Sequence, residues 1–135
     1  MLIDGRCHCG RITYSADIDP AQVGLCHCTD CQTMSGSAFR IIVPAPVAGF
    51  KLLSGDPKVY VKTAESGARR VQAFCADCGT PIYSAAEKDP PMYVLRVGAI
   101  RQKGDLRPSK QSWCRSAAGW VMELRDIKQF PTQSW

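Results

Sequence analysis

The chain contains 135 residues, of which 45% are hydrophobic and 21% are charged, a composition that is ordinary for a globular protein. This length suits one domain, here residues 1–135, which can bury a core without disulfide bonds. The formal net charge is +5, but the basic residues are scattered, and Arg69 and Arg70 form their only adjacent pair. We therefore expect no nucleic-acid partner, because such a partner needs basic residues concentrated on one face.

Turn-forming residues interrupt the chain at short intervals, a pattern that predicts many short strands. The predicted strands, in chain order, cover residues 11–16, 23–28, 38–43, 50–53, 59–62, 71–74, 81–84 and 93–97. Residues 65–67 predict the tip of a hairpin that leads into the strand at 71–74. Short helical turns are predicted after Cys31 and near Asp105. Because no segment carries a sustained helical stripe, we expect a mainly β protein.

The eight cysteines raise the question of disulfide bonds, which occur mainly in secreted chains. Residues 1–10 lack the apolar run of a secretory signal. The longest apolar stretch, residues 41–50, is broken by Pro44 and Pro46 and is far shorter than the ~20 residues that span a bilayer. We therefore expect a cytoplasmic protein with reduced thiols and no membrane partner. No feature of the sequence predicts an oligomeric state.

Two of the cysteine clusters together suit a closed metal site. Cys7 and Cys9 form a Cys-x-Cys motif, and Cys75 and Cys78 form a Cys-x-x-Cys motif followed by Gly79. In an extended segment, residues i and i+2 point to the same side, so a Cys-x-Cys aims both sulfurs at one ion. A glycine after Cys-x-x-Cys takes the positive φ that lets the chain fold back. Since structural zinc is commonly held by four cysteines, we predict one structural zinc ion on these four.

The remaining cluster offers three thiolates, at Cys26, Cys28 and Cys31. Catalytic zinc sites typically have three protein ligands and an open fourth position, so we predict a second, catalytic zinc ion here. The chain would then hold two zinc ions. Cys114 stands alone, and we interpret it as a small core residue; the alternative is a fourth ligand of this site. Asp30 lies between two ligands and is a candidate base, although it is equally suited to forming a turn.

Other interpretations of the cysteines are weaker. A redox Cys-x-x-Cys normally opens a helix in a βαβ context, whereas residues 79–82 predict a turn that enters a strand. Disulfides throughout would require an oxidising compartment. His8 and His27 alternate with cysteines, so we expect both imidazoles to point away from the metals.

The clusters together resemble the glutathione-dependent formaldehyde-activating enzyme family, also called the GFA or centromere protein V domain. The matching segments are residues 5–10, 26–31, 35–36, 50–55 and 74–81, with Trp113 and Trp120 in the tail. The resemblance covers roughly residues 5–131. It implies an Mss4-like arrangement of folded β-sheets around the structural zinc, with the two zinc sites on the cysteines assigned above. It also implies a carbon–sulfur lyase, resembling S-(hydroxymethyl)glutathione synthase, that joins formaldehyde reversibly to glutathione.

One segment departs from the family pattern. Many members carry a histidine before the tail tryptophan, where this chain has Gln111, which cannot shuttle a proton near neutral pH. Candidate contacts for the carboxylates of glutathione are basic side chains that also suit a solvated surface: Arg40, Lys51, Arg69, Arg70 and Arg115. The main alternative to an enzyme is a noncatalytic zinc-binding module, or a thiol or metal sensor, that binds a protein partner.

Overall fold

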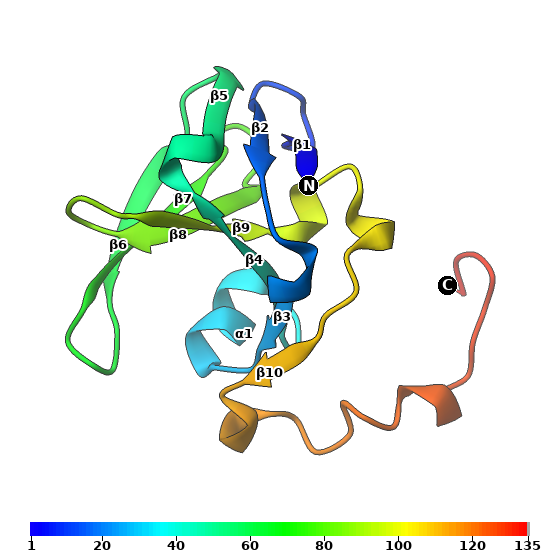
Figure 1. Ribbon diagram of the computed structural model, residues 1–135. Helices are drawn as coiled ribbons and strands as arrows, with labels where there is room; N and C mark the ends of the chain where they lie inside the picture. The colour runs from blue at the N-terminus through cyan, green and yellow to red at the C-terminus, as the bar shows by residue number, and fades with distance from the viewer. Residues whose placement is uncertain (135) are drawn as a thin grey trace.

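The computed structural model describes residues 1–134 and is mainly β (Figure 1). Within these residues it has one α-helix, α1 (Thr29–Ser35), and ten strands: β1 (Leu2–Arg6), β2 (Thr13–Asp17), β3 (Gly24–Cys26), β4 (Arg40–Pro46), β5 (Phe50–Ser54), β6 (Lys58–Thr63), β7 (Arg69–Phe74), β8 (Pro81–Ala86), β9 (Met92–Arg96) and β10 (Lys110–Ser112). Short 3₁₀ turns occupy Pro20–Gln22, Val47–Gly49, Val97–Ala99, Lys103–Asp105, Cys114–Ser116 and Leu124–Asp126. The described residues include no helix with the length and hydrophobicity needed to cross a bilayer.

The strands form two sheets. The smaller sheet has the order β1-β2-β5, and the larger one has the order β10-β3-β4-β9-β8-β7-β6. Neighbouring strands are antiparallel except β10 and β3, which run parallel and set Ser112 opposite Cys26. On its other side Cys26 faces Arg40 of β4. The end of β3 therefore lies between two strands from distant parts of the chain.

The hydrophobic core lies between the two sheets. Buried side chains of the smaller sheet, including Ile3 and Tyr14, share one cluster with Val43 and Leu95 of the larger sheet. Phe50 of β5 stacks on Tyr14, with ring centroids 5.3 Å apart. Burial of these apolar side chains is the main force that holds the sheets together.

The other face of the larger sheet is polar because side chains alternate along each strand. In β9, for example, Leu95 is fully buried in the core while Arg96 points to the opposite side and lines a cavity. Gln72 of β7 and Ser84 of β8 are paired neighbours on this polar face. Helix α1 covers this polar face near β3 (Figure 1).

Helix α1 is short and has clear signals at both ends. Cys28 is its N-cap, and its sulfur accepts a hydrogen bond from the backbone N–H of Cys31 at 3.3 Å. Gly36 ends the helix with a φ of 63°, a left-handed conformation that glycine adopts without strain. The helix begins just before Cys31, so the helical turn predicted after this residue is present but starts earlier. The turn predicted near Asp105 is also confirmed, at Lys103–Asp105.

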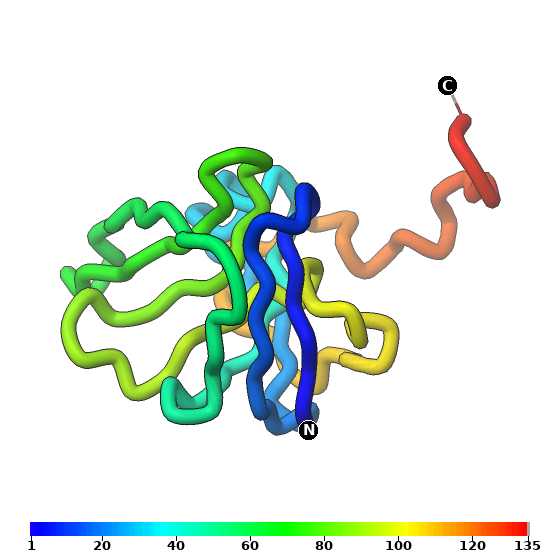
Figure 2. Tube along the Cα trace, turned by 90° about the horizontal axis from the view of Figure 1, so that it is seen from above, coloured from blue at the N-terminus to red at the C-terminus, as the bar shows by residue number. Residues whose placement is uncertain are grey.

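All eight predicted strands are present, with bounds shifted by a few residues, and the predicted mainly β class is confirmed. The hairpin tip at residues 65–67 joins β6 to β7 as predicted. Strands β1 and β10 were not predicted. Beyond the 3₁₀ turn Cys114–Ser116, which follows β10, the chain leaves the body of the molecule (Figures 1 and 2). This segment carries exposed apolar side chains, at Trp120, Met122, Leu124, Ile127 and Phe130.

Candidate functional site

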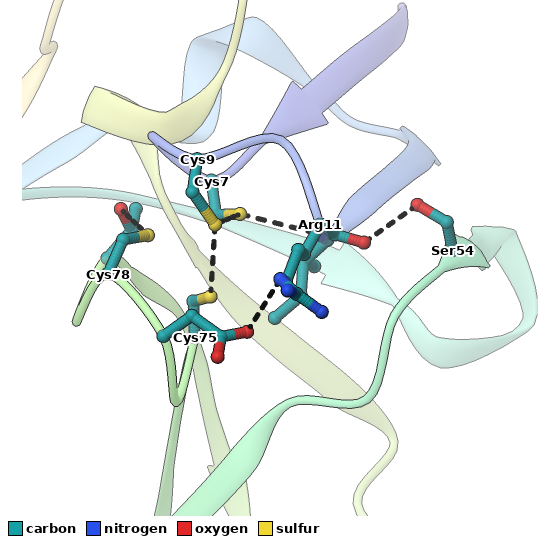
Figure 3. Close-up of polar contacts among 9 residues, drawn as sticks. Cys7, Cys9, Arg11, Ser54, Cys75 and Cys78 are labelled. Atoms are coloured by element: carbon teal, nitrogen blue, oxygen red, sulfur yellow. Dashed lines mark hydrogen bonds and ion pairs between the residues drawn. The ribbon is translucent and has the colours of Figure 1, made fainter.

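Four cysteines from two distant turns meet beside the smaller sheet. Cys7 and Cys9 lie in the turn between β1 and β2, and Cys75 and Cys78 lie in the turn between β7 and β8 (Figure 3). All four sulfurs lie within 4.8 Å of one another. The Cys7–Cys9 and Cys9–Cys75 sulfur distances are 3.6 and 3.7 Å. A tetrahedral ion with Zn–S bonds of about 2.3 Å holds its sulfurs about 3.8 Å apart, so this spacing fits one zinc ion.

Backbone hydrogen bonds shape both turns. The N–H of Gly10 donates to the carbonyl of Cys7 at 3.1 Å, and the N–H of Gly79 donates to the carbonyl of Cys75 at 2.8 Å. Both glycines have positive φ, 83° and 74°, a conformation that other residues adopt only with strain. The prediction that Cys7 and Cys9 lie in an extended segment is wrong, because the hairpin turn begins at this motif.

Side chains tie the two turns together. Arg11 forms a 3.2 Å ion pair with Asp77, and the backbone N–H of His8 donates to Oγ1 of Thr80 at 3.0 Å. Thr80 also lies 3.2 Å from the sulfur of Cys78. This hydroxyl contact, with backbone hydrogen bonds, lowers the pKa of Cys78 to about 5. The turn therefore favours the thiolate form that metal binding requires.

The second cluster is local in sequence. Cys26 ends β3, Cys28 caps α1 and Cys31 lies in the first helical turn, and their three sulfurs lie within 4.8 Å of one another. Hydrogen bonding with Cys31 lowers the pKa of Cys26 to about 5, despite the burial of Cys26. The same contact, with burial, raises the pKa of Cys31. Three neighbouring thiolates repel one another, so full ionisation of this cluster requires a cation.

His27 lies between two of these cysteines but faces the other way. Its side chain is fully buried, its Nε2 lies 2.7 Å from Oε1 of Gln111, and its ring packs edge-on against Phe39. Its backbone N–H donates to the carbonyl of Ser112 at 3.0 Å. Among residues 1–134, neither His27 nor the exposed His8 belongs to a group of side chains close enough together to bind one metal ion.

The three-sulfur cluster opens onto a cavity of about 840 Å³. Its walls come from α1, from the tip of the β6–β7 hairpin and from the chain just after β10; its floor is the polar face of the larger sheet. Cys26, Cys28 and Cys31 all line this cavity, whereas the four cysteines of the other cluster do not. The two clusters thus differ: one brings together four sulfurs, and the other brings together three that face an open volume.

Charged side chains surround this cavity. At its rim, Lys62 pairs with Asp30 at 2.6 Å and Arg115 pairs with Glu65 at 3.0 Å. On its floor, Arg96 is 8% exposed and donates to Oε1 of Gln72 at 2.8 Å. Burial, together with repulsion from the nearby Arg40, lowers the pKa of Arg96 to about 9.

The family is decided by a sequence comparison. A family model described as GFA, glutathione-dependent formaldehyde-activating enzyme, matches residues 2–116. The chain belongs to the GFA family. The resemblance noted in the sequence is thereby confirmed, and the segment after residue 116 lies beyond the matched region.

Two related proteins extend this finding. A Penicillium rubens protein named "Putative glutathione-dependent formaldehyde-activating enzyme" is 31% identical over 88 residues, which is 64% of this chain. The matched region spans 45% of that protein, less than half of its length. A crystal structure of a Rhodobacter sphaeroides protein superposes with a TM-score of 0.63 at 19% identity, covering 83% of this chain and 100% of that one. This GFA chain and that protein share a fold.

The GFA chain places the basic candidates in different surroundings. Arg70 and Arg115 line the large cavity. Arg40 is buried beside a second, smaller cavity of about 450 Å³. Lys51 is exposed on β5, and Arg69 pairs with Glu87 at 3.1 Å; within residues 1–134 neither of them lines either cavity.

Cys114, Asp30 and Arg96 also bear on the comparison with the sequence. Cys114 is exposed, so it is not a core residue, and it lies outside the three-sulfur group of the described chain. Asp30 is held in the rim ion pair with Lys62. Arg96 was missed, although the alternation of β9 carries the signal: Leu95 is apolar and inward, so its neighbour faces the opposite side.

Proposed function

We propose that this GFA chain holds two zinc ions and acts as a carbon–sulfur lyase on an adduct of glutathione, in the manner of S-(hydroxymethyl)glutathione synthase. The observation that carries the proposal is the opening of the Cys26, Cys28 and Cys31 cluster onto a cavity of about 840 Å³. Family membership and the name of the Penicillium rubens relative support the choice of substrate. We place this activity in the cytoplasm, where thiols stay reduced.

The donor sets favour zinc. Both clusters consist of cysteine sulfurs alone, soft ligands that select zinc over magnesium or calcium. In the proposed arrangement Cys7, Cys9, Cys75 and Cys78 hold the structural ion, and Cys26, Cys28 and Cys31 hold the catalytic one. At the catalytic position, bound zinc would lower the pKa of an incoming thiol and favour its thiolate.

The chain's own residues provide the volume and the polar contacts. The cavity falls within the roughly 300–1,000 Å³ range of small-molecule sites. Gln72, Ser84 and Ser112 line it and offer hydrogen bonds to the amides of a peptide-like thiol. Addition of the thiol to formaldehyde forms a carbon–sulfur bond and moves the thiol proton to the carbonyl oxygen, so the reaction needs no oxidant or reductant.

The test begins with metal content. Protein purified without chelator should contain two zinc ions, and Cys28→Ser should contain one while keeping its fold. Titration calorimetry should then detect glutathione binding to the wild type and not to Cys28→Ser. Cys114→Ser is the matched control, since this thiol lies outside both clusters, and it should behave as the wild type. Carbon-13 NMR with labelled formaldehyde would report the hydroxymethyl adduct directly.

A second candidate function is a noncatalytic zinc module that binds a protein partner. The exposed apolar side chains beyond β10, such as Trp120 and Ile127, favour it because exposed apolar groups often mark interaction sites. The same experiment separates the two functions. Two bound zinc ions without glutathione binding would contradict the lyase and favour the module.

A further inference from the structure

Two cations on the cavity floor lack a carboxylate partner. None of the ion pairs within residues 1–134 involves Arg70 or Arg96, although both line the cavity. A guanidinium carries five N–H donors, and in this part of the chain Arg96 uses its side chain in one hydrogen bond, to Gln72. Because Arg96 is buried and a buried charge is normally paired, Arg96 and the half-buried Arg70 beside the same cavity could together bind an anion.

The basic side chains at the rim of the cavity, unlike those on its floor, are neutralised by ion pairs. Lys62 and Arg115 are paired with Asp30 and Glu65, so their charges are already balanced. The unbalanced positive charge therefore lies on the floor, where Arg96 projects from the end of β9. A ligand that enters this cavity meets three sulfurs on one side and two unpaired guanidinium groups on the floor.

We propose that Arg70 and Arg96 form a carboxylate subsite for the thiol substrate, so that the cavity selects thiols bearing a carboxylate over neutral thiols. This inference rests on the proposed function, because it assumes that a substrate sulfur lies at the three-cysteine cluster. Guanidinium groups bind carboxylates through paired, charge-assisted hydrogen bonds. A lone Arg–carboxylate contact on the open surface would contribute little, whereas Arg96 is buried.

A competing role for these arginines is to balance the charge of the cysteine thiolates. Arg40 lies directly across the sheet from Cys26, and it is buried without a carboxylate partner in the described chain. In that role, loss of Arg70 or Arg96 would weaken metal retention and would affect charged and neutral thiols alike. The two roles are therefore separable by comparing ligands that differ only in charge.

The experiment measures binding of 3-mercaptopropionate and its amide, 3-mercaptopropionamide, to metal-loaded protein by calorimetry. The carboxylate should bind the wild type roughly 10–100-fold more tightly than the amide, the size expected for a hydrogen-bonded charged pair. Arg70→Gln should reduce this ratio at least several-fold with unchanged zinc content. Arg69→Gln is the matched control, because Arg69 is the adjacent residue of β7 but pairs with Glu87 outside the cavity.

The possible results separate the carboxylate subsite from the lyase activity on which it rests. Equal affinity of the two thiols for the wild type would overturn the carboxylate subsite and leave the lyase standing. Equal losses for both thiols in Arg70→Gln, with reduced zinc content, would assign the arginines to charge balance instead. Failure of both thiols to bind would overturn the proposed function itself. Arg96→Lys, which keeps the buried charge but not the planar fork, should also lower the ratio.

Discussion

The imidazole Nε2 of His27 and the side-chain oxygen of Gln111 lie 2.7 Å apart, and this contact joins the residue that follows β3 to the parallel strand β10. Gln111 thus provides a hydrogen-bond partner for one nitrogen of a fully buried imidazole. His27 stands between two cysteines of the open cluster, so its ring orientation and the placement of their sulfurs are coupled through the backbone.

Gln111→Ala should therefore destabilise the protein. Because it leaves a buried imidazole N–H without its acceptor, we expect a loss of about 1–3 kcal/mol in the free energy of unfolding. Urea denaturation measures this loss, and competition with a chelator should show faster release of the second ion. Lys110→Ala is a suitable comparison on the same strand, since Lys110 is exposed. An equal effect of both substitutions would contradict the proposed coupling.

Cys75→Ser should prevent stable folding. Cys75 is buried, and its sulfur lies 3.7 Å from that of Cys9, so the serine removes one of the four thiols proposed to hold the structural ion. Structural zinc contributes directly to the folding free energy. Circular dichroism and size-exclusion chromatography should show unfolding or aggregation. A soluble, fully folded Cys75→Ser protein would contradict the assignment of this site.

Thr80→Val should make the closed site more sensitive to acid. The Thr80 hydroxyl, together with backbone hydrogen bonds, lowers the pKa of Cys78 to about 5, well below the ordinary value for a thiol. A depressed folded-state pKa favours the thiolate above it, and the stabilisation is lost as pH falls through about 5. Without the hydroxyl this pKa rises, so protons compete with the metal at higher pH. The pH at which half of the zinc is released, measured with a chromogenic chelator, should be higher in Thr80→Val than in the wild type. The same midpoint pH in both proteins would argue against a role of the Thr80 hydroxyl in lowering the pKa of Cys78.

Gly79→Ala should destabilise the protein through backbone strain alone. Gly79 has a φ of 74°, and no atom lies within 4 Å of an added Cβ, so the substitution causes strain without a clash. The left-handed conformation costs a non-glycine residue about 1–2 kcal/mol. Gly98→Ala is the matched control, because Gly98 also has open space and its φ lies outside the left-handed region. Thermal unfolding should show a lower Tm for Gly79→Ala than for Gly98→Ala.

The parts predicted from sequence depend on local spacing. Cysteines two or three residues apart must lie near each other whatever the fold, so their grouping was visible without a structure. Strand β1 was missed because Gly5 interrupts it, and glycine normally weakens a strand. The structure gives the reason for this glycine: a Cβ there would lie 1.8 Å from the ring of Tyr14.

Other features depend on contacts that sequence spacing does not encode. Strand β10 has only three residues, all exposed, and it exists because β3 offers a parallel partner. The neighbours of Arg96 likewise come from other strands, with Gln72 on β7 and Arg40 on β4. The exposure of Cys114, in the 3₁₀ turn Cys114–Ser116, also could not be predicted from its isolated position in the sequence.

The two cysteine clusters also differ in how much conformational entropy the unfolded chain loses when the cysteines of each cluster come together. Cys9 and Cys75 are 66 positions apart, and closing a loop of this length opposes folding by roughly 4 kcal/mol of chain entropy. An ion at that site therefore acts as a long-range cross-link that forms only with the fold. Cys28 and Cys31 are three positions apart, so the unfolded chain can already chelate an ion there. Because a ligand that binds the unfolded state stabilises less, removal of the ion proposed at the four-cysteine cluster should unfold the protein, while removal of the ion proposed at the three-cysteine cluster should lower stability by a smaller amount.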